Sequence, residues 1–243
     1  MCEHCVAAEH VPIARRSILK LALAAGAGLA IAPYALAKSN KKPPKPENVL
    51  SPDAALERLM KGNDRYVEGV TKRYDFSRER KALSKGQNPF AAVLSCADSR
   101  IAPEFCFDAA RGDVFVCRVA GNFASDDITA SLEYAVQVLN TPLIVVLGHD
   151  ACGAVDATIK SIKDRTTLPG HLPSLVTAIA PAVEAVRDAP GDVLDNAIRR
   201  NIMLNVEKLK GASPILKSFV DDKKIRVAGA IYRIKSGRVE LIT

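Results

Sequence analysis

The sequence predicts an α/β fold: a central, mostly parallel β-sheet, with about four parallel strands and an antiparallel edge strand, flanked by helices. Short apolar segments, typical of strands buried on both faces, occur at 90–95, 114–119 and 143–147. Segments with apolar residues at helical spacing lie at 126–139 and 193–210. Strands that alternate with helices in this way indicate a parallel sheet covered by helices.

Local signals predict where the elements begin. The first helix is expected to start at Ser51, a capping residue followed by Pro52 and by the acidic Asp53, which favours the positive end of the helix dipole. Gly and Pro at 86–89 then break the chain ahead of the first strand. The helix at 126–139 begins with two aspartates. These signals separate the helices from the strands.

The second half of the chain completes the predicted sheet. Pro181 is expected to break the stretch between the two long helical segments, because proline removes a helix hydrogen bond. The helix at 193–210 is expected to end at Gly211. The segments 225–231 and 238–242, joined through a Ser-Gly pair, are expected to form a terminal hairpin, which supplies the antiparallel edge strand.

Length and composition narrow the class of protein. The chain has 243 residues, of which 48% are hydrophobic and 25% charged, as in ordinary globular domains. The net charge is +7, but only 5% of the residues are aromatic, whereas a nucleic-acid binder combines a basic stripe with aromatic side chains. We therefore expect a basic surface and linker, and no nucleic-acid partner.

Residues 1–37 are expected to form an export leader of the twin-arginine type. A pair of arginines at 15–16 precedes a weakly apolar segment of Ala, Leu and Gly that ends in small residues at Ala37. We expect cleavage after Ala37, a periplasmic or otherwise exported protein, and no permanent membrane span; an uncleaved anchor is the alternative. Cys2 and Cys5 lie ahead of the paired arginines, in the part expected to be removed, and are not expected to belong to the site.

The rest of the chain divides into a linker and one domain. Residues 38–50 are rich in Lys and Pro and are expected to form an extended linker. Residues 51–243 contain all the predicted strands and helices. We expect a functional site to lie within this domain, where Cys106 and Cys117 are expected to be buried free thiols.

Three residues able to bind a metal follow two of the predicted strands: Cys96, His149 and Cys152. Ligands of an open parallel sheet bind beyond the carboxyl ends of its strands, so these residues converge if the two strands are neighbours. Two thiolates and one imidazole leave one position of a tetrahedral zinc ion open, as in catalytic sites. Taken singly, each residue could be structural. A closed site, with Asp98 as fourth ligand, is the other alternative.

These segments resemble the β-class carbonic anhydrases. The resemblance is carried by the motifs Cys96-x-Asp98-x-Arg100, Arg118-Val-Ala-Gly-Asn122, Ser131-Leu-Glu-Tyr-Ala-Val136 and His149-x-x-Cys152-Gly153. It implies a zinc enzyme that interconverts carbon dioxide and bicarbonate through zinc-bound hydroxide, with one zinc ion per chain. It also implies a homodimer or a higher homo-oligomer, with 51–243 as the catalytic domain.

The resemblance assigns roles to individual residues. Cys96, His149 and Cys152 would be the zinc ligands. Asp98 would accept a hydrogen bond from the zinc-bound hydroxide, or bind the metal itself in a resting form, and Arg100 would hold Asp98. Gln87 and the backbone amide of Gly153 match groups that bind substrate oxygen. Phe115, Ala120 and Tyr134 match the apolar wall of the pocket, with ordinary core packing as the alternative.

Two other functions stay open at this point. A hydrolase of carbon disulfide or carbonyl sulfide can share this zinc site and differ only in access to it. A non-catalytic, zinc-stabilised scaffold protein is the second alternative, although a structural site needs no pair such as Asp98 and Arg100. The chain has no Trp, and Val93 stands where the bicarbonate-regulated subtype carries one. This difference favours water as the fourth ligand.

Overall fold

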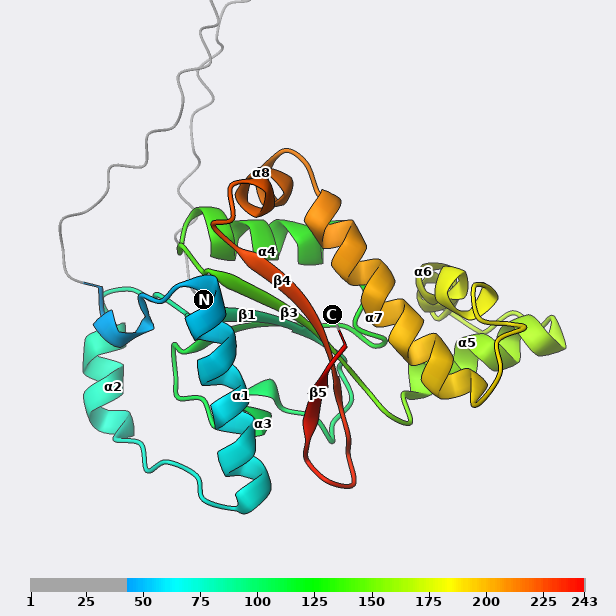
Figure 1. Cartoon of the computed structure of the whole chain (residues 1–243). Helices are drawn as coiled ribbons and strands as arrows, with labels where there is room; N and C mark the ends of the chain where they lie inside the picture. The colour runs from blue at the N-terminus through cyan, green and yellow to red at the C-terminus, as the bar shows by residue number, and fades with distance from the viewer. Residues whose placement is uncertain (1–42, 243) are drawn as a thin grey trace, which may run out of the picture. The chain divides into compact units, whose positions relative to one another are not determined.

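The structure is a computed structural model that describes residues 43–242. The predicted leader at 1–37, with Cys2 and Cys5, lies outside the described residues, as does the first part of the predicted linker. Figure 1 shows a central twisted sheet with helices packed around it. Among the described residues, no helix combines the length and the apolar character needed to cross a membrane.

Five strands form one sheet in the order β2-β1-β3-β4-β5. Their bounds are β1 Ala91–Ser95, β2 Val114–Arg118, β3 Leu143–His149, β4 Arg226–Tyr232 and β5 Val239–Leu241. Strands β1 to β4 are parallel to one another, and β5 pairs with β4 in the antiparallel direction. Every residue of β1 and β3 is buried, because helices cover the sheet. The predicted fold class and the terminal hairpin are confirmed.

Eight α-helices and a short 3-10 helix surround the sheet in the described part of the chain. Their bounds are η1 Pro46–Asn48, α1 Pro52–Glu68, α2 Phe76–Leu83, α3 Pro103–Cys106, α4 Asp126–Gln137, α5 Gly153–Asp164, α6 Pro173–Glu184, α7 Val193–Gly211 and α8 Ile215–Asp221. Helix α1 begins as predicted, with Ser51 Oγ accepting a hydrogen bond from the Ala54 amide at 3.3 Å. The helix α4 is capped in the same way by Ser125, immediately before its two aspartates.

The prediction that Pro181 breaks the chain is wrong, because Pro181 lies inside α6. A proline removes one helix hydrogen bond but does not prevent a helix whose other face is held by packing. Ile179, Ala182 and Val183 are buried on that face, and α6 packs against α5 and α7. Tertiary packing therefore outweighs the local effect of the proline.

The end of the predicted linker also differs from the extended segment that its composition indicates. Residues 46–48 form η1, and Lys45 and Asn48 are buried. The Lys45 ammonium pairs with Asp113, which also accepts a hydrogen bond from Asn48 Nδ2 at 3.1 Å. This buried charge pair attaches the start of the described chain to the domain. Cys106 and Cys117 are buried free thiols, as predicted.

Candidate metal centre

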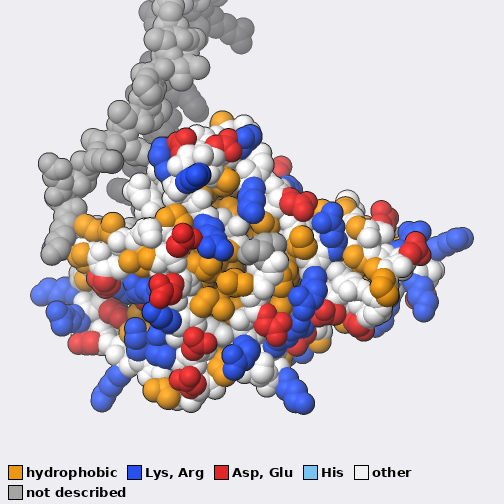
Figure 2. Space-filling view, in the orientation of Figure 1, with side chains coloured by type: hydrophobic (Ala, Val, Ile, Leu, Met, Phe, Trp, Pro, Cys, Tyr) orange, Lys and Arg blue, Asp and Glu red, His pale blue; other side chains and the backbone are white. Residues whose placement is uncertain are grey.

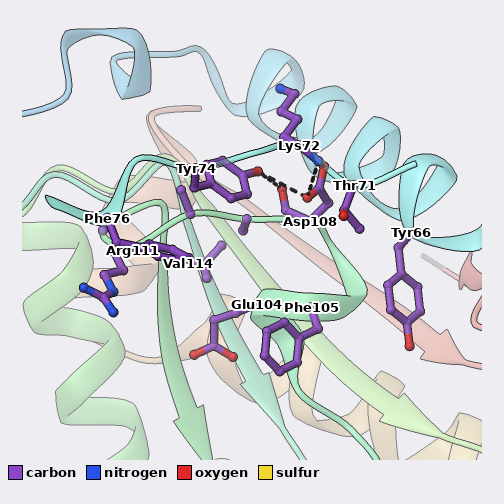
Figure 3. A pocket seen from close by; sticks show the side chains of 13 residues that line it. Tyr66, Thr71, Lys72, Tyr74, Phe76, Glu104, Phe105, Asp108, Arg111 and Val114 are labelled. Carbon is purple, nitrogen blue, oxygen red and sulfur yellow. Dashed lines mark hydrogen bonds between the residues drawn. The ribbon is translucent and has the colours of Figure 1, made fainter. Parts of the chain in front are cut away.

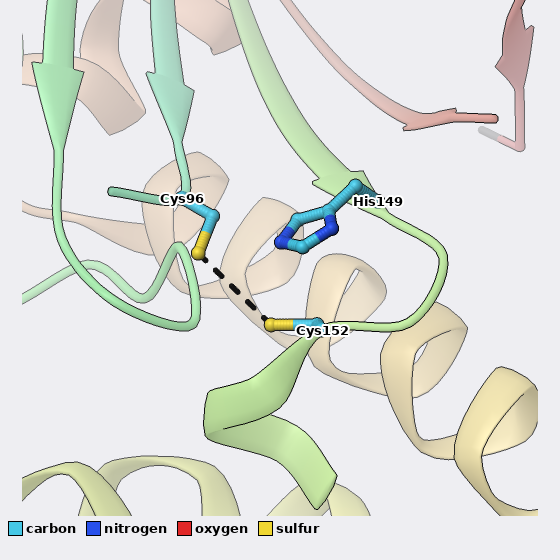
Figure 4. A group of neighbouring side chains, drawn as sticks. All are labelled: Cys96, His149 and Cys152. Atoms are coloured by element: carbon cyan, nitrogen blue, oxygen red, sulfur yellow. Dashed lines mark hydrogen bonds between the residues drawn. The ribbon is translucent and has the colours of Figure 1, made fainter. Parts of the chain in front are cut away.

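The three predicted ligands meet at the carboxyl edge of the sheet. Cys96 follows the last residue of β1, His149 ends β3, and Cys152 is the N-cap of α5. Because β1 and β3 are adjacent and parallel, their carboxyl ends lie side by side. The ligand atoms of the three residues lie within 4.8 Å of one another, and all three residues are buried (Figure 4). The predicted convergence is confirmed.

The imidazole of His149 is oriented for metal binding. Its Nδ1 lies 2.8 Å from the carbonyl oxygen of Asp150, so Nδ1–H donates to that oxygen and Nε2 carries the free lone pair. Nε2 is buried without a hydrogen-bond partner among the described residues. Asp150 is itself fixed, because its Oδ1 accepts from the Ile234 amide at 3.0 Å. A buried, unpaired imidazole nitrogen facing two sulfurs is the arrangement that a cation satisfies.

The two sulfurs share one hydrogen bond, so their pKa values shift in opposite directions. Cys96 Sγ and Cys152 Sγ lie 4.0 Å apart. The pKa of Cys96 is lowered, chiefly because Cys152 donates a hydrogen bond to its sulfur; the neighbouring His149 and the Gly121 amide, which donates at 3.3 Å, lower it further, and these effects together outweigh burial. The pKa of Cys152 is raised by its hydrogen bond with Cys96 and by burial. A divalent cation between them would stabilise both thiolates. The donor set fits zinc.

A carboxylate and a guanidinium lie beside the three ligands. Arg100 Nε and Nη2 donate to the two oxygens of Asp98 at 2.9 and 2.7 Å, and the Arg100 amide also donates to Asp98 Oδ1. These hydrogen bonds hold the pKa of Asp98 well below its usual range, against the effect of burial. Asp98 Oδ2 lies 4.0 Å from His149 Nε2. The structure therefore pairs Asp98 with Arg100 rather than including it in the ligand group.

Sequence reasoning missed one residue that supports this loop. Arg118, the last residue of β2, donates from Nε to the Cys96 carbonyl at 2.9 Å and from Nη2 to the Asp98 carbonyl at 2.8 Å. It thus fixes the backbone that carries a ligand and the carboxylate. The available signal was a charged residue at the end of the otherwise apolar segment 114–119; in the structure β2 is only partly buried and Arg118 is exposed.

Two of the predicted substrate residues lie at the cluster. Gly153 follows Cys152 directly as the first residue of α5, and a side chain added there would meet no atom within 4 Å. Its surroundings are therefore open at the helix start. Ala120 adjoins Gly121, whose amide donates to the Cys96 sulfur. Both positions border the metal ligands.

The other three predicted substrate residues lie away from the cluster of their own chain. Gln87 is exposed and lies nine residues before Cys96, ahead of the amino end of β1, and the five residues of β1 alone span about 16 Å. Phe115 is the second residue of β2, in register with Ala92. Tyr134 lies on α4 with 48% of its surface exposed. Within one chain the fold does not bring these side chains to the metal ligands.

A cavity of about 670 Å³ lies elsewhere, between α3 and the segment that leads into α2 (Figure 3). Aromatic side chains line much of it, including Tyr74, Phe76 and Phe105. Phe105 is 74% and Phe76 51% exposed. None of the predicted site residues lines this cavity, so its size does not mark the candidate metal centre.

Comparison with known proteins agrees with the geometry. Residues 91–239 match the family model described as carbonic anhydrase. The chain is 38% identical over 192 residues to carbonic anhydrase 2 of Mycobacterium tuberculosis, covering 79% of this chain and 93% of that protein. It is 36% identical to a carbonic anhydrase of Mycolicibacterium smegmatis, with the same coverage of both chains.

Solved structures show the same relationship. The β-carbonic anhydrase CcaA superimposes with a TM-score of 0.60 at 28% identity, and the match covers 77% of this chain and 95% of that chain. The sheet order, the grouped Cys-His-Cys ligands and the sequence similarity thus agree. This chain belongs to the carbonic anhydrase family, in its β class.

Proposed function

We propose that the chain catalyses the reversible hydration of carbon dioxide to bicarbonate and a proton at a zinc ion held by Cys96, His149 and Cys152. The observation that carries this proposal is the buried His149 Nε2, which has no hydrogen-bond partner among the described residues and faces two thiols. Zinc, when bound, lowers the pKa of a coordinated water and so supplies a nucleophile near neutral pH. Because carbon dioxide is small and apolar, an apolar pocket surface that excludes water suits it better than charged side chains.

The chain's own residues would orient the reacting groups. Asp98, held ionised by Arg100, acts as a hydrogen-bond acceptor that fixes the direction of the attacking oxygen. Gly153 is the first residue of α5, and an added Cβ would meet no atom within 4 Å there, so its surroundings are open; its backbone amide, at the positive end of the helix, is suited to bind a substrate oxygen. Positioning of this kind, rather than proton abstraction by Asp98, follows from its lowered pKa.

Replacement of Asp98 tests this assignment. Asp98→Ala is expected to keep the fold and the zinc content while carbon dioxide hydration, followed by stopped flow, falls about 100-fold or more. Asp156→Ala is the matched control, because in the described part of the chain Asp156 pairs with Lys160 on the exposed side of α5 and with no other residue. Full activity of Asp98→Ala would contradict the role of Asp98. A wild-type chain without zinc would contradict the proposed function itself.

Comparison of substrates separates the enzymatic alternatives. We expect turnover of carbon dioxide to exceed that of carbon disulfide and carbonyl sulfide when all three gases are supplied to the same zinc-loaded preparation. Faster turnover of a sulfur-containing gas would assign the chain to the hydrolase instead. A scaffold protein would turn over none of the three.

We propose that the protein is a homodimer or a higher homo-oligomer whose substrate pocket is completed by a second copy. Gln87 and Tyr134 are solvent-exposed and lie away from the cluster of their own chain. Apolar side chains are also exposed around β4 and β5 in Figure 2, where Leu241 on the edge strand is 42% exposed. Exposed apolar surface of this kind is typical of an interface.

Sedimentation velocity, combined with mixing of two inactive variants, tests the oligomer. Chains with Cys96→Ser lack a metal ligand, and chains with Gln87→Ala lack the proposed pocket residue. If a second copy supplies Gln87, mixed oligomers regain part of the activity. A monomer in sedimentation, or no recovery after subunit exchange, would contradict the proposal.

We also propose that the chain is exported through the twin-arginine pathway and that residues 1–37 are removed. The paired arginines at 15–16 and the small residues before the cleavage point support this proposal. A reporter that functions only outside the cytoplasm, fused after residue 37, should be active. Replacement of both arginines by lysine should abolish that signal. Continued export of the double-lysine variant would contradict the proposed pathway.

A further inference from the structure

Helix α7 carries buried amide side chains on the face turned towards segment 121–124. Asn201 is 2% and Asn205 6% exposed, and both lie one turn apart on the same side of the helix as Lys208. Burial of an amide is unfavourable unless its donors and acceptor are used. The burial of two asparagines one helical turn apart therefore needs a structural or functional reason.

The contacts of these side chains hold both ends of segment 121–124. Asn201 Nδ2 donates to the Gly121 carbonyl at 2.8 Å. At the other end, Asn205 Oδ1 accepts from the Ala124 amide at 2.7 Å and Lys208 Nζ donates to the Ala124 carbonyl at 2.6 Å. Asn205 Nδ2 also donates to Asn201 Oδ1 at 3.2 Å. The two asparagines thus support each other.

Gly121 is the point where this segment meets the metal centre. Its amide donates to Cys96 Sγ at 3.3 Å, while its carbonyl accepts from Asn201. Gly121 has a φ of +85°, and a Cβ there would lie 2.5 Å from Ile179 Cδ1, so this position requires glycine. Glycine has wide conformational freedom, and the direction of its amide depends on what holds it on both sides.

We infer that Asn201, supported by Asn205, is a positioning residue of the metal centre: it fixes Gly121 so that the Gly121 amide donates to the sulfur of Cys96. A hydrogen bond to an anionic sulfur stabilises its negative charge. Groups behind the ligands orient them, and loss of such a group lowers metal affinity or activity by about 10–100-fold. This inference rests on the proposed metal site.

The full-length chain tests this role with one variant and one matched control. Asn201→Ser removes the donor to Gly121. Asn63→Ser is the control, because Asn63 is a buried asparagine of α1 that donates to the carbonyls of Cys106 and Gly237 and touches none of the metal ligands. Two readouts are used besides activity: the sulfur-to-metal charge-transfer absorption after cobalt(II) substitution, and zinc affinity in competition with a chelator.

For Asn201→Ser we expect the charge-transfer band to move to longer wavelength and zinc affinity to fall about 10–100-fold. For Asn63→Ser we expect the wild-type band and affinity, even where its melting temperature falls equally. If Asn201→Ser does not fold, Asn205→Ser is expected to show a smaller change in the same direction. The wild-type band and affinity in both α7 variants would overturn the inference. A wild-type chain that binds neither metal would instead contradict the proposed function.

Discussion

Arg100 engages both carboxylate oxygens of Asp98, with Nε 2.9 Å from Oδ1 and Nη2 2.7 Å from Oδ2. The planar guanidinium matches the carboxylate in a way that lysine cannot. This pair keeps Asp98 ionised and in a fixed orientation 4.0 Å from His149 Nε2.

Arg100→Lys should lower carbon dioxide hydration about 10–100-fold and leave the zinc content unchanged. The lysine keeps the positive charge but loses the two-point contact, so Asp98 is free to turn. Stopped-flow kinetics on protein of measured zinc content gives the result. The control is Arg226→Lys, because Arg226 pairs with the exposed Asp53. Equal activity of both variants would mean that the geometry of the pair is unimportant.

The hydration rate should rise from mildly acidic into alkaline pH. Two thiolates cancel the formal charge of zinc, so the pKa of a coordinated water should remain above the value of about 7 that a three-imidazole site produces. Asp98 contributes no step in this range, because its pKa lies well below it. Stopped-flow rates in buffers of constant ionic strength measure the profile. A flat profile across this range would contradict the thiolate-rich ligand set.

Removal of the metal should expose one cysteine to alkylation. In the zinc-loaded protein we expect little labelling at Cys96, Cys152, Cys106 or Cys117, since the first two bind the metal and all four are buried. After chelation Cys96 should react first, because its pKa is lowered by the hydrogen bond from Cys152. Mass spectrometry of labelled peptides locates the reaction. Identical labelling with and without the metal would exclude these sulfurs as ligands.

Stability should decrease at alkaline pH partly through Cys106. Burial raises the pKa of this thiol to about 11, whereas an unfolded thiol has a pKa of about 8.5. Its contribution to stability is therefore complete below about pH 8.5 and is lost as the pH rises towards 11, because the unfolded chain releases the proton first.

Thermal unfolding of Cys106→Ala checks this sign. The variant is expected to be less stable than the wild type at neutral pH, because it loses buried side-chain volume. Between about pH 8.5 and 11, however, it should lose less stability than the wild type, since it lacks the titrating thiol. An equal loss in both proteins would show that Cys106 does not contribute.

Gly62→Ala should destabilise the domain by about 1–3 kcal/mol or more. A Cβ at Gly62 would lie 1.9 Å from the backbone carbonyl oxygen of Phe107, so α1 would have to move away from α3. Urea unfolding measures the change. Gly211→Ala is the matched control at the end of α7, because a Cβ there meets no atom within 4 Å. A neutral effect of Gly62→Ala would contradict this close packing.

The strands and the helices α1, α4 and α7 were predictable because their signals are local. The buried strands β1 and β3 are continuous apolar segments, and the start of α1 is encoded in Ser51 and Pro52. Pro181 was misleading, because a local rule cannot weigh the packing of α6 against α5 and α7. The burial of Lys45 was missed for a similar reason, since its partner Asp113 lies 68 residues away.

By itself the sequence determined the ligand types and their place after strands, because the spacing of Cys96, His149 and Cys152 can be read from strand ends. Only the tertiary structure decided that β1 and β3 are neighbours, that Arg118 holds the Cys96 loop and that Asn201 reaches Gly121. These relationships join residues far apart in the chain, where single hydrogen bonds leave no periodic trace in the sequence. The residue types therefore specify which groups can bind the metal, and long-range contacts determine how these groups are positioned.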